Sequence, residues 1–329
     1  MIKKILVIQL RRIGDVLLTT PAVRALKKTF PDAEIDFLTE PPCHEVLWQN
    51  PDIQEILVYE KRRKLNWFLN LRKRNYDCVI DFLGTPTTML LTAFSGAPLR
   101  AGPGGVFWKF GYNRLMNSTG KLYAPAEKTA MLGFLGVKPD STLPVLKLKD
   151  EDVAWAKSFA AGFAPSGRLI AFAPASRKIT RQYPWWLYAR LARLVTRDDW
   201  ARVVILWGPG EKETARKIAE ASGGRTALAP ETGTLGKLAA LISRADFLIT
   251  NCNGPKHIAV AVGTPTLTIY GSSPPSVWNP PDDGNHRVIR LESLKCIGCG
   301  LAECPEHLEC LMNLPPEEIH KEVLSFFNK

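Results

Sequence analysis

The feature that most constrains the fold of this chain is an alternation, met twice, of short apolar runs with amphipathic stretches of about ten residues. In the first half, the run Ile5–Ile8 leads through a polar loop into helical periodicity from Val16 to Phe30. The second half restarts the pattern at Leu169–Ala173. Such alternation indicates βαβ units and parallel sheets. We therefore predict an α/β chain of two Rossmann-like doubly wound domains facing a central cleft.

The same periodicity gives the remaining elements and the domain limits. Strands are expected at 34–39, 55–59, 78–82, 203–207, 247–250 and 266–270. Helices are expected at 64–74, 129–135, 185–195, 211–221, 235–243, 255–262 and 316–327. Residues 84–125 carry few periodic signals, and the Pro- and Lys-containing stretch 137–150 is expected to be a linker. The predicted domains are 1–150 and 151–315, and the final segment 316–329 could pack back on the first domain.

The charge and hydropathy of the chain argue against a secreted protein, a membrane-spanning protein, a disordered chain and a fibrous fold. The chain has 43 Lys and Arg residues against 32 Asp and Glu, a formal net charge of +11. No apolar run reaches the roughly 18 residues that a membrane span needs. The apolar start resembles a signal peptide, but Arg11 and Arg12 stand where small residues would be required, so we predict a buried strand. The excess of basic residues indicates an anionic partner: nucleic acid, an anionic membrane or phosphorylated small molecules.

Asp15 ends the polar loop between the first strand and the first helix. Gly14 permits a tight turn there, and the dipole of a helix favours a carboxylate near its N-terminus. Asp15 is therefore either a capping residue or a general base at the cleft, since an Asp with a pKa of about 3.9 is ionised at neutral pH. Arg11 and Arg12 could hold an anionic substrate beside it or could be solvated. The loop lacks the G-x-G-x-x-G pattern, so no dinucleotide cofactor is indicated.

The loop after the third strand of the second half has the pattern of an anion site. Asn253 and Gly254 make a turn, and Pro255 suits the first helical position. The N–H groups of such a helix start favour phosphate, and Lys256 would strengthen the site. The alternative is a plain loop with a hydrogen-bonded His257.

Two further loops of the second half carry residues that could contact a diphosphate or a sugar or ribose hydroxyl. Arg177, Lys178 and Arg181 put three cations after the strand at 169–173, where they could clamp a diphosphate or be ordinary surface charge. Glu211, after two glycines, could accept a hydrogen bond from a sugar hydroxyl.

The segment 61–74 carries seven positive charges, among them Arg62, Arg63 and Lys64. Nucleic acid could bind such a face, but no RNP, helix-turn-helix or zinc-finger pattern accompanies it. A polyanionic acceptor at a membrane surface explains the charges equally well, and so does a solvated helix.

Four of the seven cysteines, Cys296, Cys299, Cys304 and Cys310, fall within fifteen residues as C-x2-C-x4-C-x5-C. Four thiolates can ligate zinc or iron, and such a site would be structural because no coordination position stays open. Free thiols and disulfides stay open as alternatives.

Taken in order, these segments resemble glycosyltransferase family nine, the ADP-heptose:lipopolysaccharide heptosyltransferases, over nearly the whole chain. The most specific stretches are 12–21, 76–81, 254–259, 263–265, 304–305 and 310–312. The resemblance implies a GT-B fold, with the acceptor in the domain 1–150 and the nucleotide sugar in the domain 151–315.

By position, the resemblance makes Asp15 the catalytic base. It assigns 62–64 to the phosphorylated acceptor, Arg181 to phosphate and 254–257 to the donor diphosphate. The complete donor set is Arg181, Glu211, Cys252, Asn253, Gly254, Pro255, Lys256 and His257, and the acceptor set is Arg11, Arg12, Arg62, Arg63 and Lys64. Two positions depart from the family: Cys252 replaces an Asp that contacts the donor sugar, and Arg181 replaces a Lys.

We therefore predict an inverting, metal-independent transfer of heptose from ADP-L-glycero-D-manno-heptose to the lipopolysaccharide inner core, on a Kdo- or heptose-lipid A acceptor. The protein is expected in the cytoplasm, peripheral on the anionic inner membrane and without nucleic acid. No cofactor is required for catalysis, while zinc or iron could be structural. The alternatives are a family member with another donor or acceptor, supported by Cys252, and a non-catalytic basic module that binds nucleic acid or anionic membrane.

Overall fold

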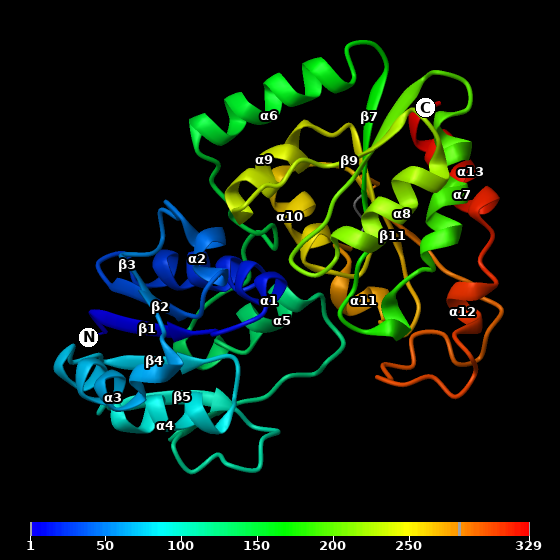
Figure 1. The fold of residues 1–329 in the computed structure, drawn as a ribbon. Helices are drawn as coiled ribbons and strands as arrows, with labels where there is room; N and C mark the ends of the chain where they lie inside the picture. The colour runs from blue at the N-terminus through cyan, green and yellow to red at the C-terminus, as the bar shows by residue number, and fades with distance from the viewer. Residues whose placement is uncertain (1, 282–283, 329) are drawn as a thin grey trace. The chain divides into compact units, whose positions relative to one another are not determined.

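The computed structural model describes residues 2–281 and 284–328, apart from the side chains of Arg63 and Lys64. The chain divides into two compact units, Met1–Lys147 and Leu148–Lys329, and each is described by itself (Figure 1). The division lies inside the predicted linker, where residues 137–149 form no helix or strand.

The first unit contains a parallel six-stranded sheet in the order β3-β2-β1-β4-β5-β6. Its strands are β1 Lys4–Ile8, β2 Glu34–Thr39, β3 Glu55–Val58, β4 Cys78–Asp81, β5 Leu99–Pro103 and β6 Arg114–Met116. The four apolar residues of β1 are fully buried, as expected for a central strand covered on both faces. The chain order reverses between β1 and β4, which makes the carboxyl ends of these strands the place where such folds bind ligands.

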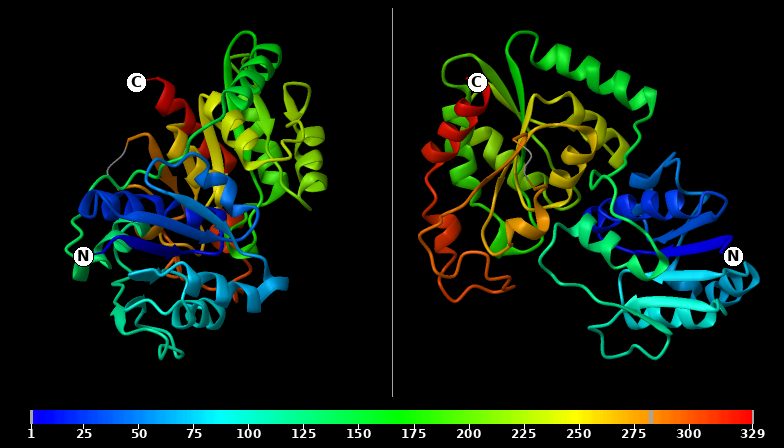
Figure 2. Two further views of the ribbon diagram at one scale, coloured as in Figure 1. Left: turned by 90° about the vertical axis from the view of Figure 1, so that its left-hand side faces the viewer. Right: turned by 180° about the vertical axis from the view of Figure 1, so that it is seen from behind.

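Helices cover both faces of this sheet (Figures 1 and 2). The helix α3 (Lys64–Lys73) packs against α4 (Pro86–Phe94), and α2 (Thr20–Thr29) packs against α5 (Ala124–Ala130). The single helix predicted from 16 to 30 is wrong, because α1 (Ile13–Leu17) ends before α2 begins.

The cause of this break is Pro21, which has no N–H for the carbonyl of Leu17. The hydroxyl of Thr20 donates to that carbonyl instead, at 2.8 Å. The helix predicted at 129–135 is also wrong, since α5 ends at Ala130 and a 3₁₀ turn follows at Gly133–Leu135. Neither α4, β5 nor β6 was predicted in the stretch 84–125.

The second unit repeats the architecture with the strand order β12-β11-β10-β7-β8-β9, all parallel. Its strands are β7 Arg168–Ala173, β8 Ala201–Ile205, β9 Thr226–Leu228, β10 Phe247–Asn251, β11 Thr266–Ile269 and β12 His286–Ile289. Its helices are α6 Asp150–Phe163, α7 Trp185–Thr196, α8 Lys212–Ser222, α9 Leu235–Arg244, α10 Gly254–Val262, α11 Pro275–Trp278, α12 Glu309–Met312 and α13 Pro316–Phe327. Two doubly wound parallel sheets confirm the predicted fold class.

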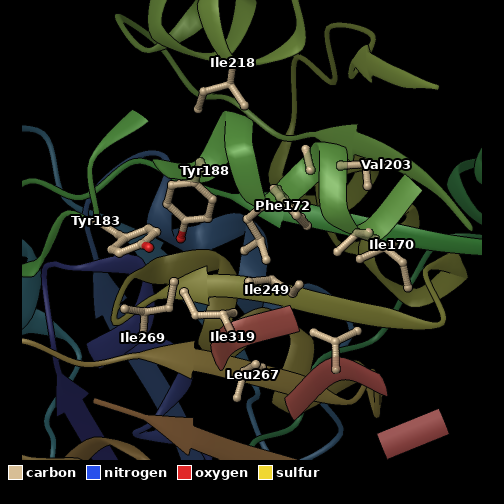
Figure 3. Packing of buried hydrophobic residues seen from close by; sticks show 14 of the residues in the cluster. Ile170, Phe172, Tyr183, Tyr188, Val203, Ile218, Ile249, Leu267, Ile269 and Ile319 are labelled. Atoms are coloured by element: carbon tan, nitrogen blue, oxygen red, sulfur yellow. The ribbon is translucent and has the colours of Figure 1, made fainter. Parts of the chain in front are cut away.

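The core of the second unit lies between the sheet and the helices α7, α8 and α13 (Figure 3). Phe172 of β7 packs on Tyr188 of α7, with 5.7 Å between ring centroids. Ile319 and Val323 of α13 are fully buried in the same cluster. The apolar side chains of this last helix, which could also pack on the first domain by the sequence prediction, therefore complete the core of the second unit.

In the part of the chain that the structure describes, no helix combines the length and the apolar character required to cross a bilayer.

Candidate functional site

The carboxyl end of β1 leads into the segment that carries the predicted base. Gln9 is buried, and its side-chain Nε2 donates to the carbonyl oxygen of Arg11 at 2.7 Å. Arg11 and Arg12 are exposed, and Asp15 is half-buried in the first turn of α1. The hydroxyl of Thr19 donates to the backbone carbonyl of Asp15 at 2.7 Å. The predicted position of Asp15 at the helix start is confirmed.

A pocket of about 490 Å³ lies at this edge of the first unit. Its lining comes from the segments that follow β1, β2, β3 and β4: Leu10, Arg11, Glu40, Tyr59, Lys61, Leu83, Thr85, Pro86 and Thr87. Nζ of Lys61 lies 3.1 Å from a carboxylate oxygen of Glu40. The pocket therefore offers cations, a carboxylate and apolar surface, which suits a sugar that bears anionic groups.

The predicted acceptor residues are only partly brought to this pocket. Arg11 lines it, whereas Arg12 does not. Arg62 is exposed in the 3₁₀ turn that begins at Lys61. The side chains of Arg63 and Lys64 lie outside the described residues.

A buried polar network at the end of β4 was not predicted. Asp81 is fully buried and accepts hydrogen bonds from the hydroxyl of Tyr112 at 2.7 Å and from the N–H groups of Leu83 and Gly84 at 2.9 and 3.1 Å. Burial raises the pKa of this carboxyl despite those bonds. The sequence signals for Asp81 were its place at the end of a buried strand and within the family-like stretch 76–81, whereas Lys128 of α5 gave no such signal.

In the second unit, Asn253 fixes the start of α10. Its side-chain Oδ1 accepts from the N–H of Lys256 at 3.1 Å and from the hydroxyl of Thr250 at 3.0 Å. Its Nδ2 donates to the carbonyl oxygens of Ala173 and Ala175 at 3.1 and 2.9 Å. Asn253 thus caps the helix and ties it to the loop after β7, so both lone pairs and both N–H donors of its side-chain amide are occupied.

The two ionisable residues that follow are buried. Lys256 is fully buried, and its ammonium donates to the backbone carbonyl of Trp278. Burial lowers the pKa of Lys256 to about 7. His257 is 4 % exposed, and burial, together with the charge of Lys256, holds its pKa well below the ordinary value. Among the described residues, none hydrogen-bonds its Nδ1.

Cys252 and Arg181 lie beside these residues. Burial raises the pKa of the Cys252 thiol, while the charges of Lys256 and Arg181 act in the opposite direction. Arg181 ends a 3₁₀ turn and is half-buried, and within 2–281 and 284–328 nothing accepts a hydrogen bond from its Nε. The predicted donor residues 181 and 252–257 are therefore neighbours at one edge of the second sheet.

The remaining residue of the predicted donor set, Glu211, lies on another loop. Glu211 bonds within its own loop, because its carboxylate accepts from the N–H of Gly208 at 2.8 Å. Arg177 is exposed and Lys178 is half-buried in the loop after β7.

All four clustered cysteines have free thiols. Cys296 and Cys299 are exposed, and Cys304 and Cys310 are half-buried. Burial and then the neighbouring charges of the other three raise the pKa of Cys310 to about 11, which indicates that the four lie near one another. Even so, no three His, Cys, Asp or Glu residues in the described chain form a group that could hold a metal ion. A structural metal stays a prediction.

The chain is similar to known proteins in sequence and in fold. The lipopolysaccharide heptosyltransferase 2 of Escherichia coli K12 is 28% identical over 315 residues, which cover 88% of each chain. A glycosyl transferase of family 9 from Veillonella parvula has a TM-score of 0.85 at 24% identity, covering 98% of this chain and 97% of that one. The Escherichia coli heptosyltransferase WaaC, solved with ADP, has a TM-score of 0.70 at 20% identity, covering 98% and 97%.

The model of glycosyltransferase family 9 (heptosyltransferase) matches residues 65–308, about three quarters of the chain. The chain therefore belongs to glycosyltransferase family 9, the heptosyltransferases, and is a glycosyltransferase.

Proposed function

We propose that the protein transfers heptose from ADP-L-glycero-D-manno-heptose to a Kdo- or heptose-bearing acceptor of the lipopolysaccharide inner core. Curated relatives are lipopolysaccharide heptosyltransferases, and related structures hold ADP or a fluorinated ADP-heptose. The observation that carries the proposal is Asp15, a half-buried carboxylate at the carboxyl edge of the first sheet, in the segment that also supplies Arg11 to the pocket.

In the proposed reaction, the carboxylate of Asp15 takes the proton from an acceptor hydroxyl. The freed oxygen attacks the anomeric carbon of heptose from the face opposite ADP. The bond between that carbon and the phosphate oxygen breaks, and ADP leaves with the electron pair. The configuration at the anomeric carbon is therefore inverted.

The leaving diphosphate needs positive charge, which we assign to Arg181, Arg177 and Lys178 and to the backbone at the start of α10. We propose that these groups make a divalent cation unnecessary in the transfer step. The side chain of Lys256 is buried, so we expect it to hold the start of α10 in place rather than to contact the diphosphate.

The exchange Asp15→Asn tests the base. Loss of general-base catalysis should lower kcat about 10²–10⁴-fold, with transfer measured from ADP-heptose to O-deacylated Kdo-lipid A. The affinity for ADP, measured by calorimetry, should stay unchanged because Asp15 is not part of the donor set. An Asn variant that retains the full rate would exclude this mechanism.

One observation favours a nucleotide-sugar donor other than ADP-heptose. Cys252 is a buried thiol where the family carries an Asp that contacts the donor sugar, so the hydroxyl groups of heptose would lack their usual acceptor. A screen of ADP-heptose against GDP- and UDP-sugars decides between the donors.

The exposed face of α3 and α4 supports association with an anionic membrane. Leu65 and Leu69, one turn apart on α3, are 77% and 64% exposed, and Phe94 at the end of α4 is 53% exposed. Arg72 and Lys73 are exposed at the end of α3. Apolar side chains beside cations suit the headgroup region of acidic lipids. Sedimentation with phosphatidylglycerol vesicles, but not with phosphatidylcholine vesicles, is the expected result.

A further inference from the structure

Lys128 of α5 extends its ammonium into the carboxyl edge of the first sheet. Its Nζ donates to the side-chain Oε1 of Gln9 and to the hydroxyl of Thr19, both at 2.9 Å. The same nitrogen lies 4.9 Å from the centre of the Phe82 ring. Gln9 and Thr19 are buried, so these bonds are shielded from water.

The two partners of Lys128 stand at opposite ends of the segment 9–19. Gln9 follows β1 and donates through Nε2 to the carbonyl of Arg11. Thr19 follows α1 and donates through its hydroxyl to the carbonyl of Asp15. Gln9 and Thr19 therefore each accept from the ammonium and donate to the backbone of the segment. One lysine from α5 thus joins both ends of the segment that carries Arg11 and Asp15.

The charges that face Lys128 explain why a cation is stable there. Burial lowers the pKa of Lys128 to about 8, whereas Asp15 on α1 and Asp81 on β4 act to raise it. Tyr112 donates a hydrogen bond to Asp81. Burial and then the charges of Glu40 and Asp15 raise the pKa of the Cys43 thiol. The charges that oppose the effect of burial on the ammonium therefore belong to the carboxyl groups of Asp15 and Asp81, and a nearby cation favours the ionised form of a carboxylate.

We infer that Lys128 is a positioning residue of the transfer reaction, which fixes the segment 9–19 and keeps a positive charge beside the carboxylate of Asp15. This inference rests on the proposed role of Asp15 as the base. Lys128 touches neither reacting atom in this scheme, so its effect is expected in kcat and in the pH profile rather than in the affinity for ADP.

The test compares Lys128→Met and Lys128→Arg in the full chain, with the rate measured from pH 5 to 9 on ADP-heptose and O-deacylated Kdo-lipid A. Lys128→Met should lower kcat about 10–10²-fold, the loss typical of a misplaced catalytic group. The acid limb of the pH–rate profile of Lys128→Met should move to higher pH, because a carboxylate without a nearby cation binds its proton more readily. The wild-type rate should fall above about pH 8 as Lys128 deprotonates. Lys128→Arg should recover part of the rate and lose that alkaline limb.

Two further variants keep the result interpretable. Lys27→Met is the matched control, since Lys27 is a half-buried lysine of the same unit that donates to the carbonyl of Ala33 at 2.9 Å. It should leave the rate and the pH profile unchanged. Thr19→Val removes one anchor but keeps the charge, so it should lower kcat by less than Lys128→Met and leave the acid limb in place. It also serves if Lys128→Met does not fold.

The outcomes separate the two hypotheses. The role of Lys128 is overturned if the Lys128→Met enzyme has the wild-type rate and pH profile. It is also overturned if a folded Thr19→Val enzyme, which keeps the charge of Lys128, shifts the acid limb of the pH–rate profile as far as Lys128→Met does. An active Asp15→Asn enzyme instead refutes the proposed base, whatever the lysine variants do.

Discussion

The two units have the same strand arrangement, but the charged side chains at the carboxyl ends of their strands are placed differently. In the first unit, cations and carboxylates stand side by side: Lys61 pairs with Glu40, Lys128 faces Asp15, and Arg11 is exposed. In the second unit, Lys256 and His257 are buried and their pKa values are lowered. The residues 1–147 hold 21 Lys and Arg against 13 Asp and Glu, while 148–329 hold 22 against 19.

This difference teaches how one sheet architecture can serve two ligands. An edge with exposed cations, such as Arg11 and Lys61, suits an acceptor that bears several anionic groups, because exposed side chains can contact such a ligand directly. An edge with a buried lysine offers instead the backbone of a helix start, held by Asn253, and the half-buried guanidinium of Arg181. The two edges should therefore respond to substitution independently.

The sharpest test of this comparison pairs Arg181→Ala with Arg11→Ala. A charge-assisted hydrogen bond contributes about 1.5–3 kcal/mol, so Arg181→Ala should weaken ADP binding about 10–100-fold in calorimetry. Arg11→Ala should raise the KM for O-deacylated Kdo-lipid A by about tenfold and leave ADP binding unchanged. Arg244→Ala, at the exposed end of α9, is the control. If both arginine variants lost ADP affinity equally, the division between the edges would be wrong.

Much of the fold could be predicted because buried parallel strands are uninterrupted apolar runs. The helix α6 was missed since only Asp152 and Ala156 of its fourteen residues are buried, so its apolar pattern is weak. The strand β9 has three residues and is too short for a period to be visible. In these cases, tertiary contacts rather than local sequence fix the structure.

The candidate site divides in the same way. Asp15 lies in the first helix after β1 and the segment 253–257 follows β10, so their position at a sheet edge is set by local sequence. Lys128 reaches Gln9 and Thr19 across 119 and 109 residues of chain. The burial of Lys256 depends on Trp278, twenty-two residues away. Contacts of that range have no local pattern, which is why the sequence predicted Lys256 as a direct phosphate ligand but not its burial.

The smallest expected effect concerns stability, through Lys256. Its pKa of about 7 in the folded protein lies below the ordinary value of 10.5. Between those values the unfolded chain binds more protons, so the free energy of unfolding should rise with pH above 7. From pH 7 to 9 we expect Lys256 to contribute a gain of about 2 kcal/mol in the wild type. Lys256→Met removes this titrating group and should show a smaller rise, because Lys128, with a pKa of about 8, contributes to the rise in both proteins.

Urea denaturation of the wild type, Lys256→Met and the control Lys237→Met at pH 7, 8 and 9 measures this difference. Lys237 is a half-buried lysine of α9 whose ammonium lies 5.6 Å from the centre of the Trp155 ring, and its removal should leave the pH dependence of the wild type intact. Parallel curves for the wild type and Lys256→Met would mean that Lys256 stays charged in the folded state. The second edge would then carry a permanent cation like the first, and the contrast between the two units would disappear.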